Sequence, residues 1–359
     1  MKVKKLTALA LALAMMFALV ACATSDQPTP TSGSSSSDPT PAANNPGEDA
    51  PAPPPPAEKK TVYVLVKVLG NQYWSVVEAG ARKAGEDLGC NVVIIGTAAE
   101  SEVEKQVALL QDAVSAKADA IVIAPLDRKA MAAPVSEQFK SNIPMILIDS
   151  SVDTEDYSAA YLTDNIAAGR LAAETMLAKL KAIGTPEDKE GVIAVTIGST
   201  GSQAIIDRDD GFKEYWDANA PATWKVLWDE IKVNDGDTQK AVTFGQDFIT
   251  AYPNLIGLFA PNNGSTVGFV KALEESGRTD ITMVGFDFSA EMEAIVRNSD
   301  YNVATILQRQ YFMGYDGVAK ALEIANGGTV TEKVVDTGVM VVDNANVDSQ
   351  EVQNIVNGG

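Results

Sequence analysis

The sequence predicts an α/β protein of two similar lobes, each built on a doubly wound parallel sheet. From Thr61 onward, short apolar runs rich in β-branched residues alternate with helical stretches. The runs, such as VYVLVKV and AIVIAP, are apolar almost throughout, which is typical of parallel strands covered by helices on both faces. Residues 61–359 also exceed what one hydrophobic core usually serves, so two lobes are expected.

The expected elements follow one another in a repeated order. Strands in VYVLVKV, NVVIIG and AIVIAP are separated by helices over 76–88 and 102–117, with right-handed crossovers. The next stretch, ADAIVIAPLD, a helix over 130–140 and IPMILIDSSVD, is matched later by NLIGLFAPNN, a helix over 266–277 and ITMVGFDFSAE. The first strand of each copy ends in Ala-Pro and the second in Asp, so the two halves follow one plan.

Polar residues follow many of these strands. In an open parallel sheet, ligands bind beyond the carboxyl ends of the strands, so two lobes of this kind predict a cleft with polar groups on both sides. The strand-end set contains no single reactive centre. Its members are Asn71, Asp149, Asn165, Arg208, Asn262, Asp287 and Gln308.

The N-terminal segment does not fit the lobe pattern. A basic start precedes an apolar stretch over 6–20, shorter than the roughly 20 residues of a membrane-crossing helix, so residues 1–21 are predicted to be a cleaved signal peptide. The string LVAC resembles the lipobox of bacterial lipoproteins, which makes Cys22 the expected lipid anchor; an ordinary secretory signal is the alternative. Residues 22–60, rich in Pro, Ser and Thr, are expected to form a disordered tether.

Composition excludes several classes of function. The formal net charge of −20 argues against a nucleic-acid partner or an anionic lipid surface. Cys90 is expected to be a core residue and not a nucleophile, because the chain has no histidine to activate it.

Asn234 to Asp237 look like the start of a calcium loop, but the twelfth position of that loop would be Gly245. No metal is therefore expected, and Asp237 is interpreted as a helix cap. Phosphate-loop and dinucleotide fingerprints are missing from the sequence, so no cofactor is expected.

Several strings together resemble a known family over 61–342. They are GNQYW (70–74), ILIDSS around Asp149, LTDNIAAG (162–169), IDRDDGF (206–212), FAPNN (259–263), VGFD (284–287) and ATILQ (304–308). In order and spacing they resemble the periplasmic binding proteins of type I, and most closely the ribose-like sugar-binding proteins of ATP-driven importers. The resemblance implies that the chain binds a ligand and is not an enzyme.

The resemblance also implies a site and a lobe assignment. The family's ligand contacts fall on Asn71, Tyr73, Trp74, Asp149, Asn165, Arg208, Asn262, Asp287 and Gln308. The family's fold implies three crossings between the lobes, a hinge near Thr163, Arg309 and Gly338. The N-terminal lobe is then 61–163 plus 309–338, and the C-terminal lobe is 164–308 plus 339–359.

Three positions depart from the ribose-binding pattern. Ser150 replaces an arginine, Gly236 replaces an aromatic residue, and Asn263 replaces an acid. These departures put ribose itself in doubt, and a somewhat larger or differently oxidised sugar is expected to use the space.

The residue types suit a sugar, whose hydroxyls pair with carboxylate, amide and guanidinium groups. Tyr73 and Trp74 are expected to sandwich its C–H faces; the alternative is that both rings belong to the core. The alternatives are that the aspartates serve only as helix caps and that Arg208 is the surface partner of Asp209 or Asp210.

We therefore expect a monomeric lipoprotein on the outer face of the cell membrane that captures a small sugar or related polyol and delivers it to the permease of an ATP-driven importer. A first alternative ligand is a signalling molecule, nucleoside or cyclitol. A second alternative, a glycoside hydrolase using Asp149 and Asp287, is disfavoured because both carboxylates are expected to be ionised, which leaves no acid with a raised pKa.

Overall fold

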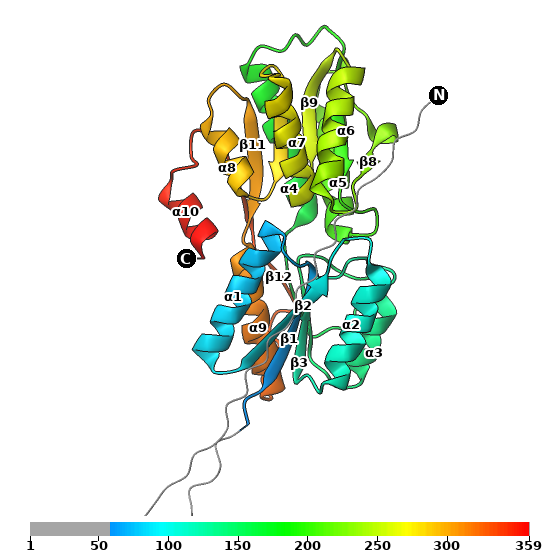
Figure 1. Cartoon of the computed structure of the whole chain (residues 1–359), viewed down its shortest axis with the longest axis vertical. Coiled ribbons are helices and arrows are strands. Elements are labelled where there is room, and N and C mark those ends of the chain that lie inside the picture. The colour runs from blue at the N-terminus through cyan, green and yellow to red at the C-terminus, as the bar shows by residue number, and fades with distance from the viewer. Residues whose placement is uncertain (1–57, 359) are drawn as a thin grey trace, which may run out of the picture. The chain divides into compact units, whose positions relative to one another are not determined.

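The computed structural model describes residues 58–358, arranged as two α/β lobes (Figure 1). The expected signal peptide, Cys22 and the expected tether up to residue 57 lie outside the described residues. Each lobe has three layers, a central sheet with helices on both faces, because the strands are apolar toward both sides.

The first lobe holds a six-stranded sheet in the order β12-β5-β4-β3-β1-β2, and every neighbouring pair is parallel. Helices α1 and α9 pack on one face, and α2 and α3 on the other. The strands are β1 (Thr61–Val68), β2 (Asn91–Thr97), β3 (Ala120–Ile123), β4 (Met145–Ile148), β5 (Ala159–Leu162) and β12 (Val334–Asp336). The helices are α1 (Gln72–Leu88), α2 (Val103–Ser115), α3 (Ala132–Lys140) and α9 (Gln310–Ala325).

The second lobe holds a sheet in the order β13-β11-β10-β9-β6-β7, with β8 paired to β6. Helices α4 and α5 cover one face, and α6, α7, α8 and α10 cover the other. The strands are β6 (Gly191–Ile197), β7 (Trp224–Val226), β8 (Lys232–Val233), β9 (Leu255–Ala260), β10 (Thr282–Phe286), β11 (Val303–Gln308) and β13 (Val339–Val342). The helices are α4 (Asn165–Ala182), α5 (Gln203–Asn219), α6 (Thr238–Ala251), α7 (Asn263–Ser276), α8 (Ala290–Arg297) and α10 (Gln350–Asn357), with a short 3-10 turn at Trp228–Glu230.

The two sheets share one strand order, which confirms the predicted fold class. Strands β2-β1-β3-β4-β5 of the first lobe correspond to β7-β6-β9-β10-β11 of the second. The expected repeat is therefore β3-α3-β4 against β9-α7-β10. One strand differs from an all-parallel sheet, since β13 runs antiparallel to β11 as the chain returns directly from the first lobe.

Two helices begin earlier than the expected ranges 76–88 and 266–277. Helix α1 starts at Gln72, where Asn71 accepts a hydrogen bond from the Tyr73 amide and caps the helix. Helix α7 starts at Asn263. Asp237 caps α6 through bonds from the Gln239 and Lys240 amides, as predicted.

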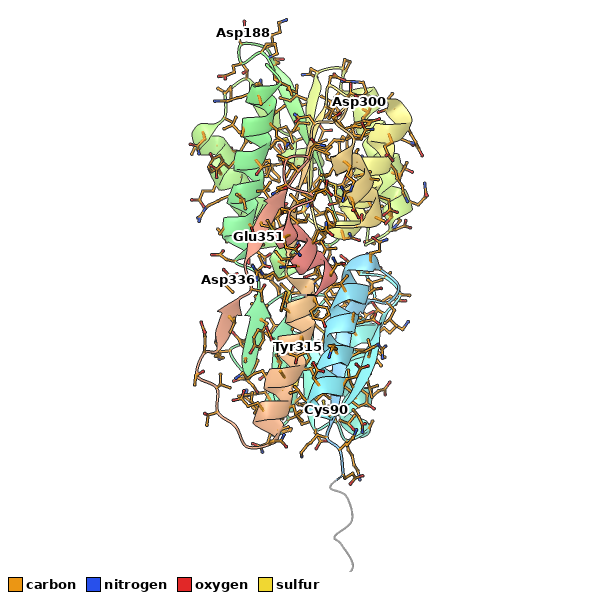
Figure 2. All side chains as sticks on the ribbon, turned by 90° about the vertical axis from the view of Figure 1, so that its left-hand side faces the viewer. Cys90, Asp188, Asp300, Tyr315, Asp336 and Glu351 are labelled. Atoms are coloured by element: carbon orange, nitrogen blue, oxygen red, sulfur yellow. The ribbon has the colours of Figure 1, made fainter. Side chains whose placement is uncertain are left out.

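Three connections join the two sheets. They run from β5 to α4, from β11 to α9, and from β12 to β13, where Figure 2 labels Asp336. These connections contain Thr163, Arg309 and Gly338; their use as a hinge, and the exact lobe boundaries, stay predictions. Cys90 packs in the core of the first lobe at 8% exposure, at the end remote from the second lobe (Figure 2).

Candidate functional site

A cavity, partly open to solvent, lies where the strands of both lobes end. The first lobe lines it with Lys67, Asn71, Tyr73, Trp74, Glu100 and Asp149, and the second with Ser202, Ala204, Ile205, Arg208, Asn262, Asn263, Gly264 and Asp287. Seven of the nine residues expected at the site therefore face one cavity; Asn165 and Gln308 do not line it.

The two strand-end aspartates reach the cavity through the same unusual backbone. Asp149 follows β4 with φ of 63°, and Asp287 follows β10 with φ of 73°. Non-glycine residues rarely adopt this left-handed region, and such positions cluster at functional sites. Neither aspartate caps a helix, since α8 is capped by Ser289 and no helix follows Asp149 directly.

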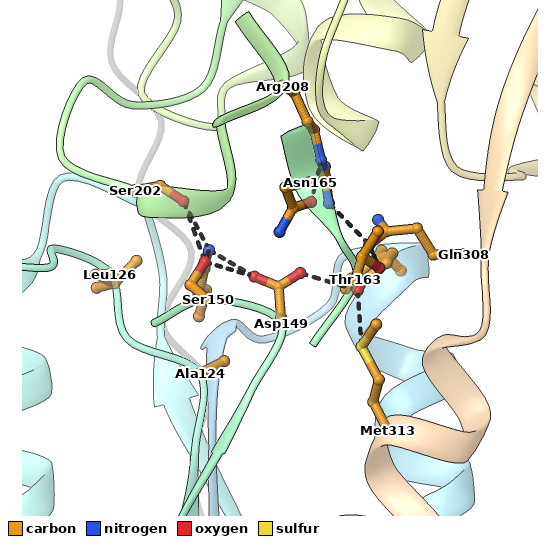
Figure 3. Close-up of polar contacts among 12 residues, drawn as sticks. Ala124, Leu126, Asp149, Ser150, Thr163, Asn165, Ser202, Arg208, Gln308 and Met313 are labelled. Atoms are coloured by element: carbon orange, nitrogen blue, oxygen red, sulfur yellow. Dashed lines mark hydrogen bonds and ion pairs between the residues drawn. The ribbon is translucent and has the colours of Figure 1, made fainter. Parts of the chain in front are cut away.

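Arg208 is buried and belongs to a polar network in the second lobe (Figure 3). Its guanidinium donates to Asn165 Oδ1 (2.8 Å), the Pro261 carbonyl (2.8 Å) and Gln308 Oε1 (2.7 Å). Gln308 Nε2 in turn donates to Asp287 Oδ1 (2.6 Å). Arg208 therefore does not pair with Asp209 or Asp210 at the surface, and Asn165 and Gln308 hold Arg208 and Asp287 in place.

Tyr73 and Trp74 line the cavity but do not form the expected sandwich. Their rings meet edge to face, with an interplanar angle of 81° and centroids 4.8 Å apart. Neighbouring residues in the first turn of a helix cannot present parallel rings on opposite sides of one ligand. The Tyr73 hydroxyl donates to Asp149 Oδ1 (2.9 Å), so its polar end is already engaged.

Three asparagines line the cavity, and two of them have a buried polar atom without a hydrogen-bond partner in the described residues. Asn71 Nδ2 donates to Asn263 Oδ1 across the lobes (3.1 Å). Asn262 Oδ1 and Asn263 Nδ2 are buried without a partner in the described part of the chain. Buried polar groups normally find partners, so a bound ligand is the natural source of the missing bonds.

Lys67 is a cavity residue that the sequence reasoning missed. It lies near the end of β1 at 5% exposure, and its Nζ is 2.7 Å from Asp149 Oδ2. The same ammonium donates to Ser150 Oγ (2.7 Å) and to Ser202 Oγ in the second lobe (3.0 Å). A cation thus lies against Ser150, the position where the ribose-like pattern has an arginine.

The acids of the cavity differ in how easily they ionise. Burial would raise the pKa of Asp149, but Lys67 and Arg208 outweigh it and hold this pKa below its usual value. Burial raises the pKa of Asp287 to about 6 despite Arg208 and Gln308. The expectation that no acid here has a raised pKa is therefore wrong for Asp287, because burial outweighs Arg208 and Gln308 there, whereas Asp149 is in direct contact with the Lys67 ammonium.

The described residues contain neither a candidate metal cluster nor a candidate membrane span. Within 58–358, no group of three or more His, Cys, Asp or Glu side chains is placed to hold a metal ion. In the same range, every helix is too short or too polar to cross a bilayer.

The family model of the periplasmic binding protein domain matches residues 62–329. The chain belongs to this family. This periplasmic binding protein is 28% identical over 276 residues to the ribose import binding protein of Escherichia coli K12, covering 77% of the chain and 88% of that relative.

Solved structures agree with this assignment. The periplasmic binding protein superposes with a TM-score of 0.78 on a carbohydrate transporter solute binding protein of Agrobacterium radiobacter in complex with D-arabinose, at 33% identity, covering 84% of this chain and all of that one. A solute binding protein of Agrobacterium vitis with bound D-fucose gives 0.75 at 32% identity, covering 82% and 99%. The predicted family and the expectation of a binding protein and not an enzyme are confirmed, which excludes the hydrolase.

Proposed function

We propose that this periplasmic binding protein captures a small neutral sugar in the interlobe cavity and delivers it to the permease of an ATP-driven importer. The observation that carries the proposal is the convergence of carboxylates, amides and one guanidinium from both lobes on a single cavity. The relatives named above add support, because their descriptions name ribose, D-arabinose and D-fucose.

The side chains suit hydroxyl groups, which both donate and accept hydrogen bonds. Asp149 and Asp287 accept, Arg208 donates, and Asn71 and Asn262 do both. Hydrogen bonds with charged partners contribute about 1.5–3 kcal/mol each. Trp74 supplies an apolar surface for a C–H face.

Binding is coupled to closure of the lobes, because the ligand contacts groups from both. A ligand shifts an open-to-closed equilibrium only through contacts that differ between the two states. Asp149 belongs to the first lobe and Asp287 to the second, so a sugar held by both favours the closed state. The importer then recognises that state.

The proposal includes attachment to the membrane. A lipid on Cys22 anchors a monomer outside the cell membrane, and residues 22–60 serve as the tether. The signal-peptide pattern and the LVAC string support this part. A Cys22→Ser variant that still fractionates with membranes would contradict it.

A thermal-shift screen with pentoses, hexoses, polyols and nucleosides tests the ligand class, because a ligand that binds only the folded state raises Tm. For a sugar that binds, we expect Asp287→Asn to weaken affinity about 10- to 100-fold in calorimetry, since a charged acceptor is lost. Asparagine also tolerates the left-handed backbone at this position.

Asp300→Asn, an exposed change in the same lobe, is the control and should leave affinity unchanged. Stabilisation by nucleosides or polyols alone would overturn the sugar proposal. Unchanged sugar affinity in Asp287→Asn would remove Asp287 from the site.

A further inference from the structure

Glu100 is an acidic cavity residue to which neither the strand-end pattern nor the family resemblance assigns a role. It lies in the loop between β2 and α2 of the first lobe. Its side chain lines the cavity together with residues of the second lobe. This loop thereby brings a third carboxylate to the site, in addition to Asp149 and Asp287.

The position of Glu100 is set by two glycines of the second lobe. A Cβ at Gly236 would lie 2.9 Å from Glu100 Cγ, and a Cβ at Gly198 would lie 2.5 Å from Glu100 Oε2. The same Cβ at Gly198 would be 2.7 Å from Asn262 Nδ2. Glu100 therefore packs against the backbone of both glycines. The space at Gly236 that was expected to admit a larger sugar is occupied by the Glu100 side chain.

The Glu100 carboxylate is not used by the protein itself. Asp149 is bonded by Lys67 and Tyr73, and Asp287 by Gln308. Glu100, by contrast, is only partly buried, and no neighbour in 58–358 donates a hydrogen bond to it. Asn262 Oδ1 is buried without a partner there, but the atom of Asn262 that lies beside Gly198 is its Nδ2. Glu100 is thus the acceptor at this end of the cavity.

We propose that Glu100 is a specificity-determining residue: its carboxylate accepts a hydrogen bond from a ligand hydroxyl at the end of the cavity beside Gly198 and Gly236. This inference rests on the proposed sugar-binding function. It narrows the ligand class to sugars that place a hydroxyl at that end.

The energetic reason is the cost of leaving the Glu100 carboxylate without a donor once a ligand covers it. A site built to bond a hydroxyl rejects an analogue without it far more strongly than an apolar pocket rejects a missing methylene. Burial raises the pKa of Glu100, and Lys67 and Arg208 only partly oppose this effect. A ligand hydroxyl that donates to the carboxylate stabilises its charged form. A sugar with that hydroxyl should therefore bind more tightly than one without it.

The test uses calorimetry with sugars paired to their deoxy analogues: D-galactose with D-fucose, which lacks the 6-hydroxyl, and D-ribose and D-arabinose with 2-deoxy-D-ribose. We expect one parent sugar to bind the wild-type protein at least about tenfold more tightly than its deoxy analogue. In Glu100→Ala most of that preference should disappear through weaker binding of the parent, with affinity for the analogue little changed. Glu100→Gln, of nearly the same shape, should show a smaller loss.

Glu104→Gln, an exposed change in the first turn of α2, is the matched control and should behave as wild type. A structural role for Glu100 predicts a different result, equal weakening of parent and analogue, and that result would overturn the inference. Unchanged affinities in Glu100→Ala, or a wild type that does not discriminate any pair, would overturn it as well. A wild-type protein that binds none of these sugars contradicts the proposed function itself, before any variant is compared.

Discussion

Asp149 and Asp287 occupy equivalent strand ends but ionise differently. Asp149 lies 2.7 Å from the Lys67 ammonium, whereas Asp287 is bonded by the neutral amide of Gln308. Burial dominates at Asp287 and raises its pKa to about 6. Asp287 therefore titrates near pH 6, and ligand binding is coupled to its titration.

We expect sugar affinity to fall as pH drops below about 6. A ligand hydroxyl donates to the ionised carboxylate and so lowers the pKa of Asp287 in the complex; below the pKa of the empty site, a proton must leave for the ligand to bind. Affinity should be constant above about pH 7 and decrease by up to roughly tenfold per pH unit below 6. Calorimetry between pH 5 and pH 8 measures this pH dependence of sugar affinity, which the Asp287→Asn variant should lose. Equal wild-type affinity at pH 5 and pH 8 would show that Asp287 does not accept a hydrogen bond from the ligand.

The residues of the site were only partly predictable from sequence. Strand-end residues such as Asp149 were found because parallel strands end at one edge of a sheet. The sequence analysis treats Lys67 only as part of the strand VYVLVKV. A lysine in a strand that is buried on both faces requires a polar partner, and this requirement is a usable signal of a site. Glu100 carried no such signal, because its loop reaches the cavity only through the way the two lobes meet.

At the scale of elements, each lobe contains a helix pair that crosses at glycines. In the first lobe, a Cβ at Gly80 of α1 would lie 2.0 Å from the Tyr311 carbonyl oxygen, and one at Gly314 of α9 would lie 2.0 Å from that of Val77. In the second, a Cβ at Gly169 of α4 or at Gly211 of α5 would lie 2.1 Å from a facing carbonyl oxygen. Backbone contacts backbone at both crossings, so these glycines set the helix spacing.

Gly314→Ala is expected to destabilise the protein by about 1–3 kcal/mol, because the added methyl group overlaps main-chain atoms that cannot rotate away. Gly317→Ala, on the same helix, is the matched control: its Cβ would meet only the side chains of Ile148 and Val122 at 3.1 Å. It should cost much less, since alanine also favours a helix by about 1 kcal/mol over glycine. Urea unfolding of both variants measures the difference, and equal stabilities would show that the crossing adapts.

The order of helices and strands was predictable where periodicity and strand composition agreed. The first and last residues of each element were less predictable. The β3-α3-β4 and β9-α7-β10 repeats were visible as matched strings in the two halves. The antiparallel β13 was not, because its direction depends on the chain's return from the first lobe after β12. Local sequence patterns do not reveal such long-range connections.

At the scale of the whole described unit, polar bonds join the two lobes. Lys67 Nζ donates to Ser202 Oγ (3.0 Å), and Asn71 Nδ2 donates to Asn263 Oδ1 (3.1 Å). On the rim, the Ala290 amide donates to Gln72 Oε1 (3.1 Å). The groups that bridge the lobes also line the cavity in the first two cases, so ligand recognition and closure share the same side chains.

The double variant Ser202→Ala with Asn263→Ala should shift the ligand-free protein toward an open arrangement. Each lost bond removes about 0.5–1.5 kcal/mol from the closed state, so the equilibrium should move by about 1–3 kcal/mol, or roughly 5- to 150-fold. Small-angle scattering should then report a larger radius of gyration for the empty variant, and sugar should reduce it again. Thr250→Ala, an exposed change on α6, is the control. Superimposable scattering curves for the empty variant and wild type would mean that these bonds do not hold the lobes together, and that closure depends on the ligand alone.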